Sequence, residues 1–561
     1  MNKFLLLTAI SFSLFLFIAS INPVYAISKE EKKLSEFIKK YESEASKLEL
    51  DVNNTEWNAY ISGKKEDYDE MSKAEIAWNL YHSNKKAYKQ LIEWRDSNNI
   101  TSPDLKRKLS LIINNYGPYQ FSAELIEKIS QKEAELQRIF NFYRGKIDDK
   151  TVTEKDIYEI LGKSKNTEER QKAWEAQKAV GPEVESKLIE LIKLRNQGAK
   201  ELGFSNFHEM SVSFSDQDPK EVEEIFKSLA SDTDKKFIEY KKELDKKIAS
   251  RVNKKVEELM PWDYSNPFFQ DESEGFAPDL SKYYEGRNIP LIGYSFYNEI
   301  GLPLGNVLKN SDLYEKEGKS QHAFCFDIDR NNDARILMNI RPNEESLSTL
   351  LHESGHAVYD LNTDKSQSWL YRTQAHTLTT EGCAMYFERF TKNPKWLEKN
   401  MGIKLSKDEI KNLKKQETLS DLIFCRWTLV MYNFEKSMYE NPDQDLNSLW
   451  WELVEKYQNI KKPEGRNKAD WASKIHLVSA PVYYHNYMLA GLLVAQLQHK
   501  IGTKFAKDEK WDEFDVTGNK EVGRWLKTNI YKPGAKYNWN LLIKKATGEE
   551  LTSKYFVERI D

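Results

Sequence analysis

The chain contains 561 residues, of which 40% are apolar, 12% aromatic and 31% charged. The length is enough for about three or four domains, or for one large multi-lobed enzyme with a deep core. The high aromatic content excludes an intrinsically disordered chain. Lys and Arg number 84 and Asp and Glu number 88, which gives a net charge of −4. This near-balance argues against a nucleic-acid coat and against a polybasic membrane binder.

Residues 1–26 have the pattern of a secretory signal peptide. Lys3 provides a basic start, residues 4–21 are almost wholly apolar, and residues 24–26 place small side chains where signal peptidase requires them. An uncleaved membrane anchor is the alternative, because such an apolar segment can nearly span a bilayer. No later segment is long and apolar enough to do so. We therefore expect an exported protein, periplasmic or secreted, whose mature part is residues 27–561.

Helical periodicity dominates the rest of the chain. Apolar residues recur at helix spacing from Val184 to Ile192, and Gly203 follows as a stop signal. Residues 219–259 form a charge-rich helical tract, and the Pro, Gly and aromatic residues of 261–282 predict a long ordered loop. One β-hairpin is expected at 324–340, where apolar residues alternate on both sides of an Arg-Asn-Asn-Asp turn. The expected fold is mainly α, with a single hairpin.

A metal-binding motif follows this hairpin directly. Asn343 is a suitable cap for a helix that carries His352-Glu353-Ser354-Gly355-His356. Histidines four residues apart share one helix face, so His352 and His356 can bind one metal ion. Glu353 lies beside them and can move a proton from water to a leaving amine.

The third metal ligand must come from another segment. The candidate is Glu381, at the start of a segment (381–390) that has a helical pattern. Two histidines and a glutamate with one open position are the ligand set of thermolysin-like peptidases. We therefore expect a zinc peptidase with one Zn²⁺ per chain.

A second group of polar and aromatic residues lies near the C-terminal end. His476 and the run 481–487 contain imidazole and phenol groups. Such residues are more often satisfied parts of a core. Near a zinc site, however, they can donate hydrogen bonds to the oxyanion of a tetrahedral intermediate.

In these residues the chain resembles the angiotensin-converting enzyme family of zinc peptidyl-dipeptidases. It also has affinity to the thimet oligopeptidase and oligoendopeptidase group. The similarity covers most of the mature chain, and its matches follow one another in order: His322-Ala323, Leu347-Ser348-Thr349 before the zinc motif, Trp450-Trp451, Lys456-Tyr457-Gln458, Lys474-Ile475-His476, and Tyr484 with Tyr487. The resemblance implies a large two-lobed helical peptidase, with two subdomains around a deep central channel and the hairpin beside the zinc helix.

The resemblance also implies roles for single residues at the reaction centre. His352, His356 and Glu381 would bind zinc. Glu353 would be the general base and then the general acid. His476 and Tyr487 would donate hydrogen bonds to the scissile carbonyl as it becomes an oxyanion.

Further residues would position the peptide. His322 and the backbone of Ala323 would align it as an added strand. Lys474, with Tyr483 or Tyr484, would hold the free C-terminal carboxylate two residues beyond the cut. This anchor would make the enzyme release C-terminal dipeptides.

The chain departs from the family pattern at several positions. One extra residue lies between His476 and the tyrosine pair, which leaves Tyr483 and Tyr484 as alternatives for one role. His485-Asn486 replace the chloride-binding arginine beside the second tyrosine, so chloride dependence is not expected to carry over. The acidic residue shortly after the third ligand is also absent. Glu388 or Asp360 would then supply the carboxylate that orients a zinc histidine.

Three functions compete. An exported zinc peptidase that removes C-terminal dipeptides from short peptides is favoured by Lys474. A zinc oligoendopeptidase that cuts short peptides internally is the main alternative, and a non-catalytic peptide-binding module would be expected to lack a ligand or the base. We expect short peptides as partners, no nucleic acid, and no stable membrane insertion after signal cleavage.

Overall fold

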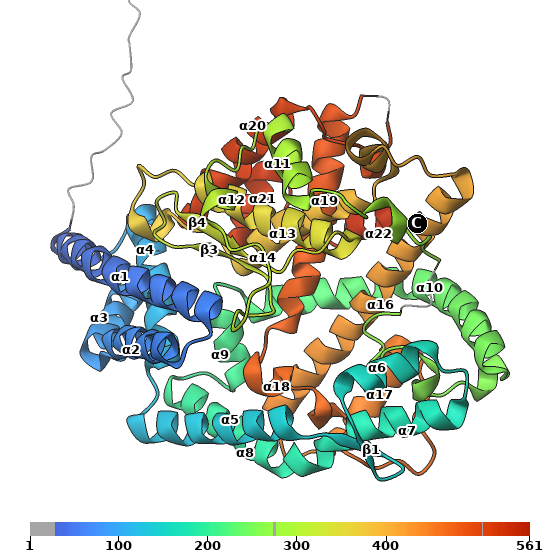
Figure 1. The fold of residues 1–561 in the computed structure, drawn as a ribbon. Coiled ribbons are helices and arrows are strands. Elements are labelled where there is room, and N and C mark those ends of the chain that lie inside the picture. The colour runs from blue at the N-terminus through green and yellow to red at the C-terminus, as the bar shows by residue number, and fades with distance from the viewer. Residues whose placement is uncertain (1–27, 273–275, 508, 561) are drawn as a thin grey trace, which may run out of the picture.

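The computed structural model describes residues 28–272, 276–507 and 509–560, and Figure 1 shows that most of them lie in helices. Within these residues, the strands form two separate two-stranded antiparallel sheets. The predicted mainly α fold is therefore confirmed. The expected signal peptide, residues 1–26, lies outside the described residues. No helix in the described ranges combines the length and the apolar character that crossing a membrane requires.

The first helices build a small unit with its own core. They are α1 (Lys29–Ser62), α2 (Lys65–His82), α3 (Lys85–Asp96) and α4 (Pro103–Tyr116). The sharp turn after α1 depends on Gly63, whose φ of 65° is left-handed. A Cβ at this position would lie 2.0 Å from the carbonyl oxygen of Gly318, so only glycine fits.

The next helices include the lower group in Figure 1. They are α5 (Ala123–Phe142), α6 (Glu154–Lys163), α7 (Thr167–Lys178), α8 (Val180–Glu201), α9 (Phe207–Phe214) and α10 (Pro219–Val252). α8 confirms the helix predicted before Gly203. α10 ends at Val252, earlier than the predicted residue 259, because Asn253 adopts a left-handed φ of 54° and caps the helix.

A hairpin that the sequence did not predict lies between α5 and α6. β1 (Gly145–Ile147) pairs with β2 (Lys150–Val152) in antiparallel register. Asp148 and Asp149 form its tight turn with φ of 47° and 63°, both left-handed. Three-residue strands carry too little alternation to be recognised, so the expectation of one hairpin was wrong.

The predicted hairpin at 324–340 is confirmed. β3 (Phe324–Asp327) pairs with β4 (Ala334–Leu337) from Phe324↔Leu337 to Asp327↔Ala334. The outer edge of β4 is partly covered, because the backbone of Asp312 bonds to Ile336 and Met338. Among the described residues, no strand pairs with the outer edge of β3.

Most of the remaining helices form the upper group in Figure 1, whereas α17 (Leu446–Gln458) and α18 (His476–Ser479) lie in the lower one. The others are α11 (Ile289–Glu299), α12 (Val307–Asn310), α13 (Glu344–Leu361), α14 (Thr377–Glu388), α15 (Pro394–Trp396), α16 (Lys407–Glu440), α19 (Tyr484–Phe505), α20 (Lys520–Leu526), α21 (Trp539–Thr547) and α22 (Lys554–Ile560). The long helix α16 runs from the upper group to the lower one (Figure 1). The division of residues 27–561 into two subdomains stays a prediction.

Glycines allow α13, α14 and α19 to pack closely. A Cβ at Gly355 of α13 would lie 2.7 Å from the Cα of Ala384 in α14. A Cβ at Gly382 of α14 would lie 2.7 Å from the side chain of Leu493 in α19. Gly355 of the metal-binding motif and Gly382 beside Glu381 are therefore small because the facing helix occupies their space.

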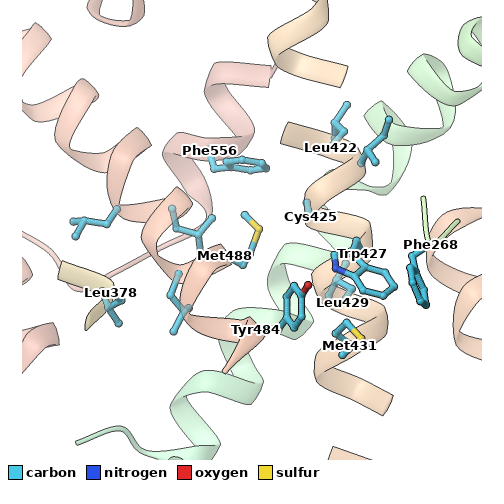
Figure 2. Close-up of a cluster of buried hydrophobic side chains, with 14 of the residues drawn as sticks. Phe268, Leu378, Leu422, Cys425, Trp427, Leu429, Met431, Tyr484, Met488 and Phe556 are labelled. Carbon is cyan, nitrogen blue, oxygen red and sulfur yellow. The ribbon is translucent and has the colours of Figure 1, made fainter. Parts of the chain in front are cut away.

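The main hydrophobic core reaches from these helices to α16. Figure 2 shows Tyr484 and Met488 of α19 facing the buried face of α16, where Trp427 and Leu429 lie. The rings of Tyr484 and Trp427 are 5.8 Å apart and perpendicular, and Phe268 packs on the other side of Trp427 at 5.4 Å. The described parts of the predicted loop, residues 261–272 and 276–282, are thus held by aromatic packing, as expected.

Candidate metal centre and its surroundings

Helix α13 places both motif histidines on one face. The side chain of Asn343 accepts a hydrogen bond from the backbone of Ser346 at 2.9 Å and starts the helix. His352 and His356 lie one turn apart, and their Nε2 atoms are 3.1 Å from each other. The imidazoles therefore converge on one point, as the spacing predicted.

Helix α14 brings the third predicted ligand to the same point. The Glu381 carboxylate lies 3.5 Å from Nε2 of His352 and 4.0 Å from Nε2 of His356. One donor atom from each of the three residues lies within 4.8 Å of the others. Two imidazoles and one carboxylate at this spacing fit a Zn²⁺ ion with an open fourth position.

Helix α14 begins four residues before Glu381, at Thr377, and not at Glu381 as predicted. The ring Nδ1 of His376 accepts the backbone N–H of Leu378 at 3.0 Å and caps the helix. Histidine is an uncommon cap, so no clear start signal precedes this helix in the sequence.

Hydrogen bonds fix the orientation of both imidazoles. Nδ1 of His352 bonds to the Glu388 carboxylate at 2.7 Å, and Nδ1 of His356 bonds to the Thr380 hydroxyl at 2.6 Å. These bonds leave the Nε2 atoms directed at the metal position. Of the two predicted carboxylates, Glu388 takes this place and Asp360 does not. Thr380 was not predicted, although it directly precedes Glu381.

The charges of the two histidines differ. Burial lowers the pKa of His352, but its hydrogen bonds with Glu381 and Glu388 outweigh this effect and raise the pKa to about 10. Burial lowers the pKa of His356 to about 4, helped by the neighbouring His352. One of the two imidazoles is therefore ready to bind a metal in its neutral form, and the other would exchange its proton for the metal.

Glu353 is positioned to act as a base. It is only 7% exposed, and its carboxylate accepts a hydrogen bond from the backbone of Cys325. Burial raises its pKa to about 7, His352 opposes this shift, and Glu381 and Glu388 add to it. A carboxylate with such a pKa is suited to accept and return a proton near neutral pH.

Glu353 and the three donor residues line one cavity of about 790 Å³, and Tyr487 of α19 lines it too. The ring of Tyr487 lies 5.2 Å from that of Tyr483 and 5.8 Å from that of Tyr484. Tyr483 is half-buried. Burial raises the pKa of its phenol, and the nearby Glu381 carboxylate raises it further. The structure therefore brings Tyr487 to the cavity of the candidate metal centre, and Tyr483 packs against Tyr487.

His476 lies behind Tyr484 and is farther from the candidate metal centre than Tyr487. Its imidazole packs against Tyr484 at 5.0 Å and is not among the residues that line the cavity. Its buried Nδ1 has no hydrogen-bond partner among the described residues. Burial lowers the pKa of His476 to about 4, so its ring is neutral at physiological pH.

The extra residue before the tyrosine pair coincides with a strained turn. Val482 has a φ of 56°, which is unfavourable for a β-branched side chain. Its backbone N–H donates to the buried Glu435 carboxylate at 2.9 Å, which holds the turn in place. This turn leads into α19 and sets the direction of Tyr483 and Tyr484.

Lys474 lies in a buried pocket with Tyr484. Its Nζ donates a hydrogen bond to Oε1 of Gln270 at 2.7 Å and lies 5.1 Å from the Trp427 ring centre and 5.5 Å from that of Tyr484. Burial lowers the pKa of Lys474 to about 8, while Glu154 and Asp271 oppose the shift. Of the two alternatives, the structure places Tyr484 beside Lys474. Gln270 was not predicted, because a loop glutamine has no sequence signature.

A second cavity of about 520 Å³ adjoins the first. His322 and Ala323, which directly precede β3, line it. Ala323, His352, Glu353 and Glu388 line both cavities, so the two form one cleft that passes the metal centre. His322 is exposed, and the open edge of β3 begins beside it.

His485 and Asn486 form a neutral network away from the metal centre. His485 and Asn486 each bond to the side-chain amide of Gln217, at 2.8 and 2.9 Å. Burial lowers the pKa of His485 to about 3, so the ring carries no charge. These side chains satisfy one another.

The chain was compared with protein families and with characterised proteins. Residues 28–231 and 263–557 match the profile of the peptidase family described as angiotensin-converting enzyme. Angiotensin-converting enzyme of Haematobia irritans exigua is 23% identical, over 96% of this chain and 94% of its own length. That of Theromyzon tessulatum is 22% identical, over 94% of this chain and 90% of its own length.

A third relative has a different name. It is the inactive angiotensin-converting enzyme-related protein of Caenorhabditis elegans, 21% identical over 80% of this chain and 54% of its own length. The family profile covers far more than half of the described residues, and the ordered motifs of the sequence agree with it. The chain therefore belongs to the angiotensin-converting enzyme family of metallopeptidases.

Proposed function

We propose that this protein is an exported zinc peptidyl-dipeptidase that releases C-terminal dipeptides from short peptides. The observation that carries the proposal is the convergence of His352, His356 and Glu381 within 4.8 Å, with Glu353 lining the same cavity. Export, to the periplasm or the medium, rests on the signal-like pattern of residues 1–26. The matched relatives named angiotensin-converting enzyme support the peptidase class.

The presence of every reactive group distinguishes this proposal from a non-catalytic one. One relative is named inactive, so family membership alone does not establish activity. This chain keeps His352, Glu353, His356 and Glu381, and the convergence of the three donor residues beside Glu353 supports a catalytic role.

The three donor residues would hold one zinc ion. When bound, this ion would supply the Lewis acidity that activates water and polarises the scissile carbonyl. Glu353 takes the proton of the attacking water and passes it to the leaving amine. Tyr487 donates a hydrogen bond to the carbonyl oxygen as negative charge develops there, and we propose His476 as a second donor.

Two further groups would select the bond that is cut. His322 and Ala323 begin the open edge of β3, along which an extended peptide adds as a strand. Lys474, Tyr484 and Gln270 would bind the free C-terminal carboxylate, with Tyr483 nearer to the metal centre. A carboxylate bound there fixes the cut two residues from the end of the peptide.

The test is a product analysis by mass spectrometry. Residues 27–561 are incubated with one peptide as a free acid and as a C-terminal amide, with and without a zinc chelator. We expect successive losses of two residues from the free acid only, abolished by the chelator. Internal cuts in both forms would show a zinc oligoendopeptidase instead, and chelator-resistant cuts would contradict zinc chemistry.

A further inference from the structure

One end of the candidate cleft carries a pair of carboxyl groups that the proposed reaction does not use. Side chains alternate along β3, so Phe324 and Phe326 face Trp57 and Tyr60 of α1 at ring distances of 5.1 to 6.2 Å. Asp327 lies on the opposite face of the strand. On that face Asp327 lies close to Asp360 of α13. Burial raises the pKa of Asp360 well above its ordinary value, and the charge of Asp327 raises it further.

Both residues line the cavity of the candidate metal centre, and each has one buried carboxyl oxygen without a hydrogen-bond partner among the described residues. Asp360 is 7% exposed, and its Oδ1 has no hydrogen-bond partner among the described residues. Oδ1 of Asp327 accepts the backbone N–H of Arg330 at 2.9 Å, whereas its Oδ2 is buried and likewise unpartnered within the described chain. Unpartnered carboxylate oxygens in a buried place are costly unless a cation or a donor joins them.

The neighbouring charges are already engaged. The Arg330 guanidinium bonds to Glu49 of α1 and stacks on Trp369 at 4.1 Å. Nζ of Lys365 donates to the backbone oxygen of Asp360 and to the Thr363 hydroxyl, each at 2.7 Å, and it does not line the cavity. The charges of Arg330, which lines the same cavity, and of Lys365 partly offset the two carboxyl groups, but no described side chain bonds to the unpartnered oxygens.

The position of the pair along the cleft identifies what would reach it. Glu353 and Asp360 are seven residues apart on α13, which places them about 10 Å apart along the helix axis. An extended peptide covers this distance in about three residues. Dipeptide release leaves only two residues beyond the cut, and Lys474, which would bind their end, does not line this cavity. The pair thus lies beside residues that precede the cut.

From this arrangement we propose that Asp327 and Asp360 form a subsite for a basic side chain, lysine or arginine, at the second or third residue before the cleaved bond. The subsite rests on the proposed function and deepens it by naming a substrate class. The cationic head of such a side chain pairs with the two carboxyl groups at the cavity wall and replaces the proton that the buried pair otherwise holds.

The proposal is tested with a set of free-acid peptides that differ at one position only. Lysine or glutamine is placed in turn at the first, second and third residue before the cut, and kcat/KM is measured for each. We expect at least a tenfold preference for lysine at the second or third position. Asp327→Asn combined with Asp360→Asn should reduce the lysine-to-glutamine ratio to about two or less, whereas Asp51→Asn, on the exposed face of α1, should retain it.

Two further measurements keep the subsite separate from the proposed function. Asp360→Lys should reverse the preference from lysine to glutamate at the same position. In the Glu353→Gln variant, calorimetric binding of the lysine peptide should exceed that of the glutamine peptide, whether or not the wild-type protein cleaves either. Cleavage of neutral peptides with no lysine preference would overturn the subsite alone. No cleavage of any peptide, with the binding preference retained, would overturn only the proposed reaction.

Discussion

The two halves of the candidate site are built in different ways. The metal half lies on α13 and α14, which touch through Gly355, and hydrogen bonds from Glu388 and Thr380 hold its histidines. The anchor half joins Lys474, next to a short 3₁₀ turn, with Gln270 from a loop 204 positions away. The first half is local in sequence and rigid, and the second is assembled from distant segments.

This difference separates two aspects of function. Residues on packed helices hold the reacting groups at fixed positions, as breaking a bond requires. Residues on loops and on the strained turn at Val482 vary more easily between relatives, and they would decide which bond is cut. Changes in the metal half should therefore affect every substrate, and changes in the anchor half should affect substrates selectively.

The largest effect should follow from Glu353→Gln. This change removes the base and leaves the three zinc donors in place, so kcat should fall by about a thousandfold or more for all peptides. Zinc content, measured by atomic absorption after dialysis, should stay at one ion per chain. Glu124→Gln, an exposed glutamate on α5, is the control and should retain activity. Turnover above a tenth of the wild-type value would remove Glu353 from the role of base.

Lys474→Met should have a selective effect. Methionine keeps much of the side-chain length but loses the charge, so kcat/KM for free-acid peptides should fall by about 10- to 100-fold. C-terminal amides, which lack the anchored charge, should change by less than about threefold. The two substrate series are measured in parallel on the same protein sample. Equal losses in both series would show that Lys474 does not recognise the free carboxylate. They would also contradict the distinction between the two halves of the site.

Glu388→Ala should weaken the metal half without removing a ligand. The loss of its bond to Nδ1 of His352 should lower zinc affinity by about 10- to 100-fold. A competition titration with a zinc-binding dye measures this change. Thr380→Ala should also lower the zinc affinity, because it removes the hydrogen bond to Nδ1 of His356. Unchanged affinity in both variants would show that the histidines are oriented by helix packing alone.

The smallest expected effect is the change in stability that Asp360→Asn causes. Burial raises the pKa of Asp360 well above its ordinary value of 3.8, so the folded state holds a proton that the unfolded state loses near pH 4. The wild type therefore loses stability as the pH rises from about 4 towards the folded pKa, and asparagine avoids this loss. Calorimetric melting should show a gain of roughly 2 °C at pH 8 and a smaller gain at pH 5. An equal gain at both values would contradict the raised pKa.

Local patterns predicted that His352, His356 and Glu381 come together, and the structure shows this convergence. Histidines four apart on a capped helix define their own geometry, and Glu381 followed from the zinc chemistry that this geometry implies. The choice between Glu388 and Asp360 needed the structure, because both lie on helices and only the crossing of α13 and α14 decides which reaches His352. Thr380 was missed for the same reason.

The anchor half and the small sheet were harder to predict. Lys474 and Tyr484 came from family resemblance and not from spacing, and Gln270 lies in a loop whose course depends on aromatic packing around Phe268 and Trp427. The β1–β2 hairpin was missed because its strands have three residues each and its Asp-Asp turn is uncommon. Long-range contacts and very short strands leave little periodic signal.

The most direct test of the central claim is the position of the metal. Crystals of residues 27–561 grown with zinc are measured with X-rays above and below the zinc absorption edge. We predict one anomalous peak per chain, about 2.0–2.2 Å from Nε2 of His352, Nε2 of His356 and a carboxylate oxygen of Glu381. A peak bound by other residues, or none at these three in zinc-saturated crystals, would contradict the account.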